Sequence, residues 1–179
     1  MLMANKKSRI RIDIQYYETC CLPGKKPGAF LLWKALPTCY LCAVETARIV
    51  YQGELETVAT HAGSGVSIRT DAPPDNQGKG SSFSPTDLLA ASLGCCMLTV
   101  MGIKARDHGI RIEGARIVIT KVMASEPRRV SSLVVEVLMP SGSYQEKEKV
   151  LLERTALHCP VAKSLHPDIQ QRITFRYQD

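Results

Sequence analysis

An uncharged stretch of sixteen residues, 88–103, constrains the fold more than any other part of the chain. Ser84, Pro85 and Asp87 occupy the N-cap, first and third positions of a helix start, and Gly109 marks its end. Because the stretch is apolar around its whole circumference, the helix must be covered on all sides. It is shorter than the roughly 18 to 20 residues that span a bilayer, so we expect a buried core helix and no membrane association.

Strand-like segments flank this helix on both sides. The three upstream segments are separated by turn residues and predict an antiparallel meander: 47–51, 55–60 and 65–70. The downstream segments predict a hairpin, a helix capped by Ser143 and Glu146, a short helix and a final strand: 112–123, 128–139, 144–158, 160 onward and 172–177. The order is typical of an α+β fold. A three-stranded meander cannot cover an all-apolar helix, so a second sheet or a second subunit is expected.

The sequence pattern and the distribution of charge indicate one folded domain preceded by an N-terminal extension. The 179 residues suffice for one domain with a real core. Residues 45–179 carry the regular pattern, whereas 1–44 have no sustained period and predict a poorly ordered or loosely docked extension. Most of the net charge of +6 lies in that extension, with seven basic and two acidic residues, which argues against nucleic-acid binding by the domain. No apolar core follows the first basic cluster, so we expect a cytoplasmic protein.

The polar segment 71–82 contains Gly-Lys-Gly but lacks the spacing of a phosphate-binding loop, and predicts a plain loop. Four of the seven cysteines lie in the extension. Cys39 and Cys42 form a Cys-x-x-Cys, while Cys20 and Cys21 are adjacent and cannot easily supply two tetrahedral zinc ligands. Zinc at Cys39 and Cys42 is therefore a minor alternative, beside a redox pair and incidental cysteines.

Two cysteines of the domain lie in defined settings. On the long helix, Ser92 and Thr99 share a face with Cys96, which makes a polar stripe on an apolar cylinder, whereas Cys95 is predicted to be core. Cys159 occupies the N-cap of the short helix, where backbone N–H groups favour a thiolate, so it is expected to be the more acidic thiol. Burial would raise the pKa of Cys96, so a reactive Cys96 needs a nearby cation or hydrogen-bond donors.

The stretch Phe-Ser-Pro-Thr-Asp-Leu-Leu-Ala-Ala-Ser-Leu-Gly-Cys-Cys-Met at 83–97, with Cys-Pro-Val-Ala-Lys-Ser-Leu at 159–165, resembles the OsmC/Ohr family. The resemblance covers about residues 45–179. It implies an intertwined homodimer in which antiparallel sheets wrap around central helices. It also implies that Cys96 attacks an organic hydroperoxide, that Cys159 resolves the resulting sulfenate, and that a thiol or dithiol reductant resets the pair. No metal or organic cofactor is implied.

The chain departs from the family at the residues that activate the attacking thiol. Family members place a Glu directly after the helix-opening proline, where it orients an Arg beside the thiol, but this chain has Thr86 there. Asp87 is the candidate substitute, or acts only as a cap. Arg69 is the candidate Arg, or only a solvated charge at a strand end. Two functions stay open: a peroxidase in oxidative-stress defence, and a non-catalytic or slowly reacting dimer that acts as a thiol redox sensor or small-ligand binder.

Overall fold

The computed structural model describes residues 45–178, and its strands and α-helices follow the predicted α+β order. The elements are β1 (Ala47–Gly53), β2 (Glu56–His61), β3 (Ser67–Asp71), the 3-10 turn η2 (Pro74–Asn76), α1 (Pro85–Asp107), β4 (Arg116–Ser125), β5 (Arg128–Leu138), α2 (Glu146–Leu157), α3 (Pro160–Ser164) and β6 (Gln170–Arg176). The predicted extension, with Cys20, Cys21, Cys39 and Cys42, lies outside the described residues. Its role and the domain boundary therefore remain predictions.

The strands form two three-stranded sheets. The first has the order β1-β2-β3 and is the predicted antiparallel meander. The second has the order β4-β5-β6; β4 pairs antiparallel with β5, but β6 runs parallel to β5. The second sheet is therefore mixed, and the expectation of purely antiparallel sheets is wrong. The chain passes through α2 and α3 before β6, and a crossover of this kind returns a strand in the same direction as its neighbour.

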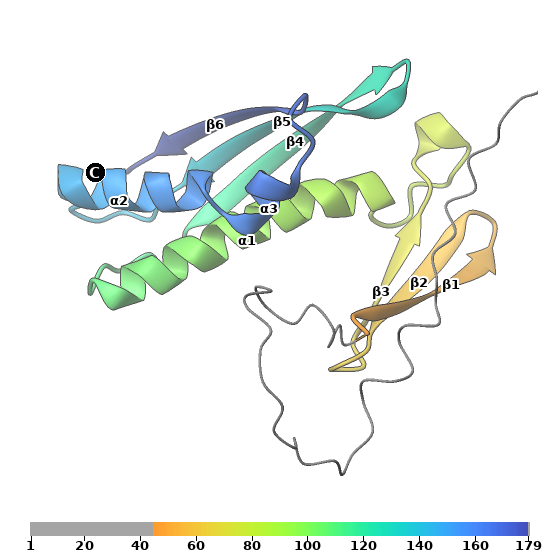
Figure 1. Cartoon of the computed structure of the whole chain (residues 1–179), viewed down its shortest axis with the longest axis horizontal. Coiled ribbons are helices and arrows are strands. Elements are labelled where there is room, and N and C mark those ends of the chain that lie inside the picture. The colour runs from red at the N-terminus through yellow and green to blue at the C-terminus, as the bar shows by residue number, and fades with distance from the viewer. Residues whose placement is uncertain (1–44, 179) are drawn as a thin grey trace, which may run out of the picture. The chain divides into compact units, whose positions relative to one another are not determined.

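Helix α1 lies along the second sheet, with α2 and α3 beside it (Figure 1). Its buried side chains recur every three or four positions and form one face: Ala90, Leu93, Met97, Met101 and Ala105. Packing is close at Gly94, where a Cβ atom would lie 3.2 Å from Ile117 Cγ2 of β4. By length and apolar composition α1 is the one described helix that could cross a membrane, but its buried face belongs to the hydrophobic core.

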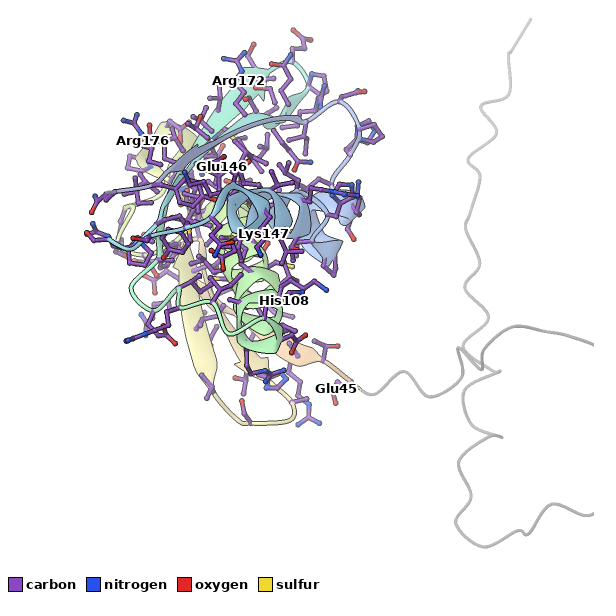
Figure 2. All side chains as sticks on the ribbon, turned by 90° about the vertical axis from the view of Figure 1, so that its left-hand side faces the viewer. Glu45, His108, Glu146, Lys147, Arg172 and Arg176 are labelled. Carbon is purple, nitrogen blue, oxygen red and sulfur yellow. The ribbon has the colours of Figure 1, made fainter. Side chains whose placement is uncertain are left out.

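Apolar side chains on α1 and on the first sheet remain exposed among the described residues. Away from its buried face, α1 leaves Leu89 and Ile103 exposed, so the cover expected on all sides is present on one side only. In β1, the neighbouring residues Ile49 and Val50 are 64% and 55% exposed. Successive strand residues point to opposite faces, so β1 is covered on neither face, whereas Thr70 and Asp71 at the end of β3 are buried. In the second sheet the outer face is polar at β6, where Arg172 and Arg176 lie on the side away from α1 (Figure 2).

Two predicted boundaries shift. Helix α2 has Gln145 as its N-cap, and the Glu148 carboxylate accepts a hydrogen bond of 2.8 Å from the Gln145 N–H, so the predicted cap at Ser143 is wrong. Strand β4 begins at Arg116, later than predicted, because the chain turns at Gly114 with a φ of +91°. The capping and strand patterns in the sequence are local, and packing in the folded chain decides at which of several neighbouring residues each element begins.

The segment 71–82 is a loop, as predicted, apart from the end of β3 and the 3-10 turn η2, and it surrounds a buried carboxylate. Asp71 is fully buried, and its Oδ2 accepts hydrogen bonds from the Ser81 N–H at 2.8 Å and the Ser81 hydroxyl at 2.9 Å. The hydrogen bond from the Ser81 N–H is the main reason that the pKa of Asp71 is lowered. A Cβ atom at Gly78 would lie only 1.7 Å from the carbonyl oxygen of Ala72. The loop therefore closes on itself around a buried carboxylate and requires glycine at 78.

Candidate functional site

The structure brings Cys96 and Cys159 together. Cys159 belongs to the hydrophobic core and is 1% exposed, and Cys96 packs against that core from α1. The two thiols are close enough for Cys96 to influence the ionisation of Cys159 through a side-chain hydrogen bond and its charge. As predicted, Cys159 is the N-cap of α3, and its Sγ accepts a hydrogen bond of 3.4 Å from the Ala162 N–H. The site is a pair of interacting thiols, one half-buried and one buried.

The expectation that the N-cap position of α3 favours a thiolate at Cys159 is wrong. Burial raises the pKa of Cys159 above its ordinary value of 9.0, the hydrogen bond from Ala162 opposes this, and Cys96 raises the pKa further. A single turn of helix presents few N–H groups, and Cys159 is almost fully removed from water, so the cost of burying a thiolate outweighs the helix terminus. Cys159 is therefore held as a neutral thiol near pH 7.

Two polar neighbours of Cys96 on α1 use their hydroxyl groups within the helix. The Ser92 hydroxyl donates to the Leu89 carbonyl at 2.7 Å, and the Thr99 hydroxyl donates to the Cys95 carbonyl at 2.8 Å. Both hydroxyl protons are used within the helix backbone, as is common for Ser and Thr in helices. Cys95, predicted as core, is exposed, because it lies away from the one face of α1 that the second sheet covers.

Asp87 binds a cation that sequence analysis missed. Its Oδ1 lies 2.7 Å from Lys121 Nζ of β4, and its Oδ2 accepts hydrogen bonds from the N–H and hydroxyl of Ser84 in the predicted capping box. Burial acts to raise the pKa of Asp87, but hydrogen bonds from Lys121 and Ser84 together outweigh it and lower the pKa. Asp87 thus remains ionised and joins the start of α1 to β4.

Lys121 also donates hydrogen bonds to the hydroxyls of Ser84 at 2.9 Å and Thr86 at 2.7 Å. The cation Lys121 therefore lies beside Thr86, the position where family members carry Glu. It is far from the thiols, because ten residues separate Thr86 from Cys96, or roughly 15 Å of helix rise. One feature of the sequence indicates the position of Lys121. It lies on the same side of β4 as Ile117 and Ile119, so its ammonium group faces the helix and requires a hydrogen-bonding or charged partner there.

Arg69 is not brought to the cysteines within the described part of the chain. Its guanidinium forms an ion pair of 2.8 Å with Glu56 on the neighbouring strand β2, and its side chain is 62% exposed. This placement of Arg69 agrees with the alternative stated above, a solvated charge at the end of a strand.

The arrangement of α1, the two sheets and the Cys-Pro helix start can be compared with known proteins. The model of the OsmC-like protein family matches residues 78–174, a range that includes both Cys96 and Cys159. The chain belongs to the OsmC-like family. The resemblance noted from residues 83–97 and 159–165 is thereby confirmed. Among curated proteins, no match was found.

Solved structures of OsmC-like proteins share the fold. A Psychrobacter arcticus protein named for an osmotic-stress-induced and detoxification response is 50% identical, with a TM-score of 0.73, and the match covers 77% of this chain and all of that one. An OsmC-like protein from Mycoplasma pneumoniae is 16% identical over 74% of this chain and 96% of its own, with a TM-score of 0.63. An organic hydroperoxide resistance protein from Legionella pneumophila is 15% identical over 74% and 98%, with a TM-score of 0.60. At those low identities the last two show the fold alone.

Proposed function

We propose that this OsmC-like protein is a thiol-dependent peroxidase that reduces organic hydroperoxides in oxidative-stress defence. The observation that carries the proposal is the contact between the half-buried Cys96 and the buried Cys159 in an apolar setting. Apolar surroundings favour a hydroperoxide with an organic substituent over hydrogen peroxide. Names of OsmC-fold structures from Legionella pneumophila and Elizabethkingia anophelis, both given for organic hydroperoxide resistance, point the same way.

In the proposed reaction the Cys96 thiolate attacks the O–O bond, which leaves a sulfenic acid on Cys96 and releases the alcohol after proton transfer. The Cys159 thiol then condenses with this sulfenic acid to form a disulfide and water. An external dithiol reduces the disulfide and restores both thiols. No step requires a metal or an organic cofactor.

A second candidate is a slowly reacting thiol sensor that keeps the family fold. Two observations favour it: the pKa of Cys159 is raised by burial, and Arg69 is paired with Glu56 away from the thiols. Both would slow a catalytic cycle without preventing a single oxidation.

A steady-state assay separates the two functions. With cumene hydroperoxide and excess dithiol, the peroxidase is expected to consume many equivalents of peroxide per chain, with tert-butyl hydroperoxide also reduced and hydrogen peroxide reduced at least about tenfold more slowly. Oxidation that stops after one equivalent per chain, despite a reductant shown to reopen the disulfide, would instead establish the sensor.

We also propose that the protein is a homodimer in which a second copy covers the open surfaces of α1 and of the first sheet. Exposed apolar side chains on one helix and on both faces of a sheet are unusual for a monomer. A second subunit would supply the cover that the sequence analysis expects around the all-apolar helix, and it could bring a second Arg69 toward Cys96.

The dimer predicts a solution mass of twice the chain mass of 19.7 kDa in light scattering. Ile103→Asp, which places a charge at a 49% exposed position on α1, is expected to shift the protein to monomer. Val118→Asp is the matched control, because Val118 is 54% exposed on the face of β4 away from α1. A monomeric parent chain, or dissociation by both variants alike, would contradict the proposal.

A further inference from the structure

A cavity of about 340 Å³ lies away from the cysteines, where the first sheet meets the start of α1 and the β4–β5 hairpin. Its apolar lining comes from several elements: Tyr51, Leu55, Pro73, Pro85 and Met123. Cys96 lies eleven residues beyond Pro85, or roughly 16 Å along the helix. The volume falls within the range of small-molecule sites, about 300 to 1,000 Å³. The cavity is thus large enough for a ligand and separate from the thiol pair.

Interactions between distant segments hold the walls of this cavity in place. Arg128, at the start of β5, forms an ion pair of 3.0 Å with Asp75 of η2. Lys79 pairs with Glu54 and so joins the β1–β2 turn to the loop before α1. That loop is itself fixed by the close approach at Gly78. The cavity is therefore formed before any ligand arrives, which reduces the ordering cost of binding.

Arg128 supplies the charge that orients a ligand. Its side chain lines the cavity and is 42% exposed, and one terminal nitrogen donates to Asp75. A guanidinium has five N–H donors, so most of them remain for a second acceptor, and their planar fork fits a carboxylate. An apolar cavity with one arginine is suited to an organic carboxylate with an apolar body.

The larger cavity beside Lys121 does not offer the same capacity. It has a volume of about 620 Å³ and is lined by both Lys121 and Asp87. The three N–H donors of the ammonium are already used by Asp87, Ser84 and Thr86. A ligand there would have to break the capping arrangement of α1. The cation of that cavity is structural, and Arg128 is the better carboxylate ligand.

We propose that the cavity around Met123 binds a small carboxylate with an aliphatic or aromatic body, and that Arg128 binds its carboxylate group. The apolar body lies against Tyr51, Leu55 and Met123. The site adds a ligand-binding function that does not depend on turnover at Cys96.

Isothermal titration calorimetry with octanoate tests this site in the full-length reduced protein. The parent chain is expected to bind octanoate, and to bind 1-octanol, which has the same tail and no charge, at least about tenfold more weakly. Arg128→Gln is expected to weaken octanoate binding by about tenfold or more. Arg129→Gln is the matched control, since Arg129 is the next residue but pairs with Asp168 and does not line the cavity; it is expected to change the affinity by less than about twofold.

Asp75→Asn is expected to change the affinity for octanoate in the opposite direction. It removes the negative charge that competes for Arg128 but keeps a side-chain oxygen that accepts the hydrogen bond holding the wall, so octanoate should bind more tightly than to the parent chain. A variant that merely loosened the loop would bind more weakly instead. The proposal is overturned if the parent chain shows no octanoate binding at millimolar concentration, if Arg128→Gln binds as the parent does, or if Asp75→Asn and Arg128→Gln weaken binding together.

Discussion

Replacing Cys96 with serine is expected to lower kcat/KM for cumene hydroperoxide by about a thousandfold or more. A serine hydroxyl is not ionised near neutral pH and cannot form a sulfenic acid, so no part of the proposed cycle survives. Cys95→Ser is the matched control: it makes the same change one position away, on an exposed thiol with no proposed role. Activity within about threefold of the parent chain is expected there.

Cys159→Ser should separate the two chemical steps. Peroxide would still oxidise Cys96, but the sulfenic acid would persist and could be trapped with dimedone and located by mass spectrometry. In the parent chain the same intermediate should decay faster as the pH rises. The buried Cys159 thiol has a pKa above 9.0 and must lose its proton to attack, so its reactive fraction increases through the alkaline range.

The assignment of roles is wrong if Cys159 is oxidised in Cys96→Ser as fast as Cys96 is in Cys159→Ser. It is also wrong if Cys95→Ser loses as much activity as Cys96→Ser. In the first case the buried thiol would be the attacking one, and the physical argument from burial would have to be reversed.

Local chemistry made the first turn of α1 predictable. Ser84 and Asp87 specify a capping box that depends on four consecutive residues, and the structure contains it. The Cys159 N-cap was predictable for the same reason, because Pro160 fixes the first helical position. The α+β order followed from segment lengths and periodicity. These features need little information from elsewhere in the chain.

Features that depend on distant residues were not predictable in the same way. The parallel pairing of β6 with β5 depends on how α2 and α3 pack, and the periodicity of β6 alone does not reveal it. The pKa of Cys159 depends on its burial beneath α1, which reversed an expectation drawn from its N-cap position. The family resemblance indicates Arg69 as the activating cation, yet its partner is Glu56 across the sheet.

These differences have one physical origin. Caps and turns are decided within about four residues, whereas the ionisation of a side chain is decided by whatever surrounds it in space. Lys121 is a second example of a residue whose partners depend on the fold. The alternation of β4 predicts that Lys121 faces the helix. Its partners, however, lie 34 to 37 positions earlier in the chain, and only the fold identifies them.

Gly78→Ala is expected to destabilise the protein by about 3 kcal/mol or more. The added Cβ would lie 1.7 Å from the Ala72 carbonyl oxygen and 2.2 Å from its carbon, which are backbone atoms that cannot rotate away. Relief requires the loop to open, which would disturb the hydrogen bonds from Ser81 to Oδ2 of the buried Asp71. Urea unfolding at one fixed protein concentration measures the loss, since an oligomer's stability depends on concentration.

Gly142→Ala is the matched control for this substitution, because its Cβ would meet only the Tyr144 ring, at an ordinary distance of 3.5 Å. It is expected to be neutral or to stabilise by up to about 1 kcal/mol through the unfolded state. Hydrogen exchange should locate the damage of Gly78→Ala in residues 72–82 first, since that is where the clash arises. Equal stability of the two variants would mean that the loop has a second backbone path, and that the wall it forms beside Arg128 is less fixed than its contacts indicate.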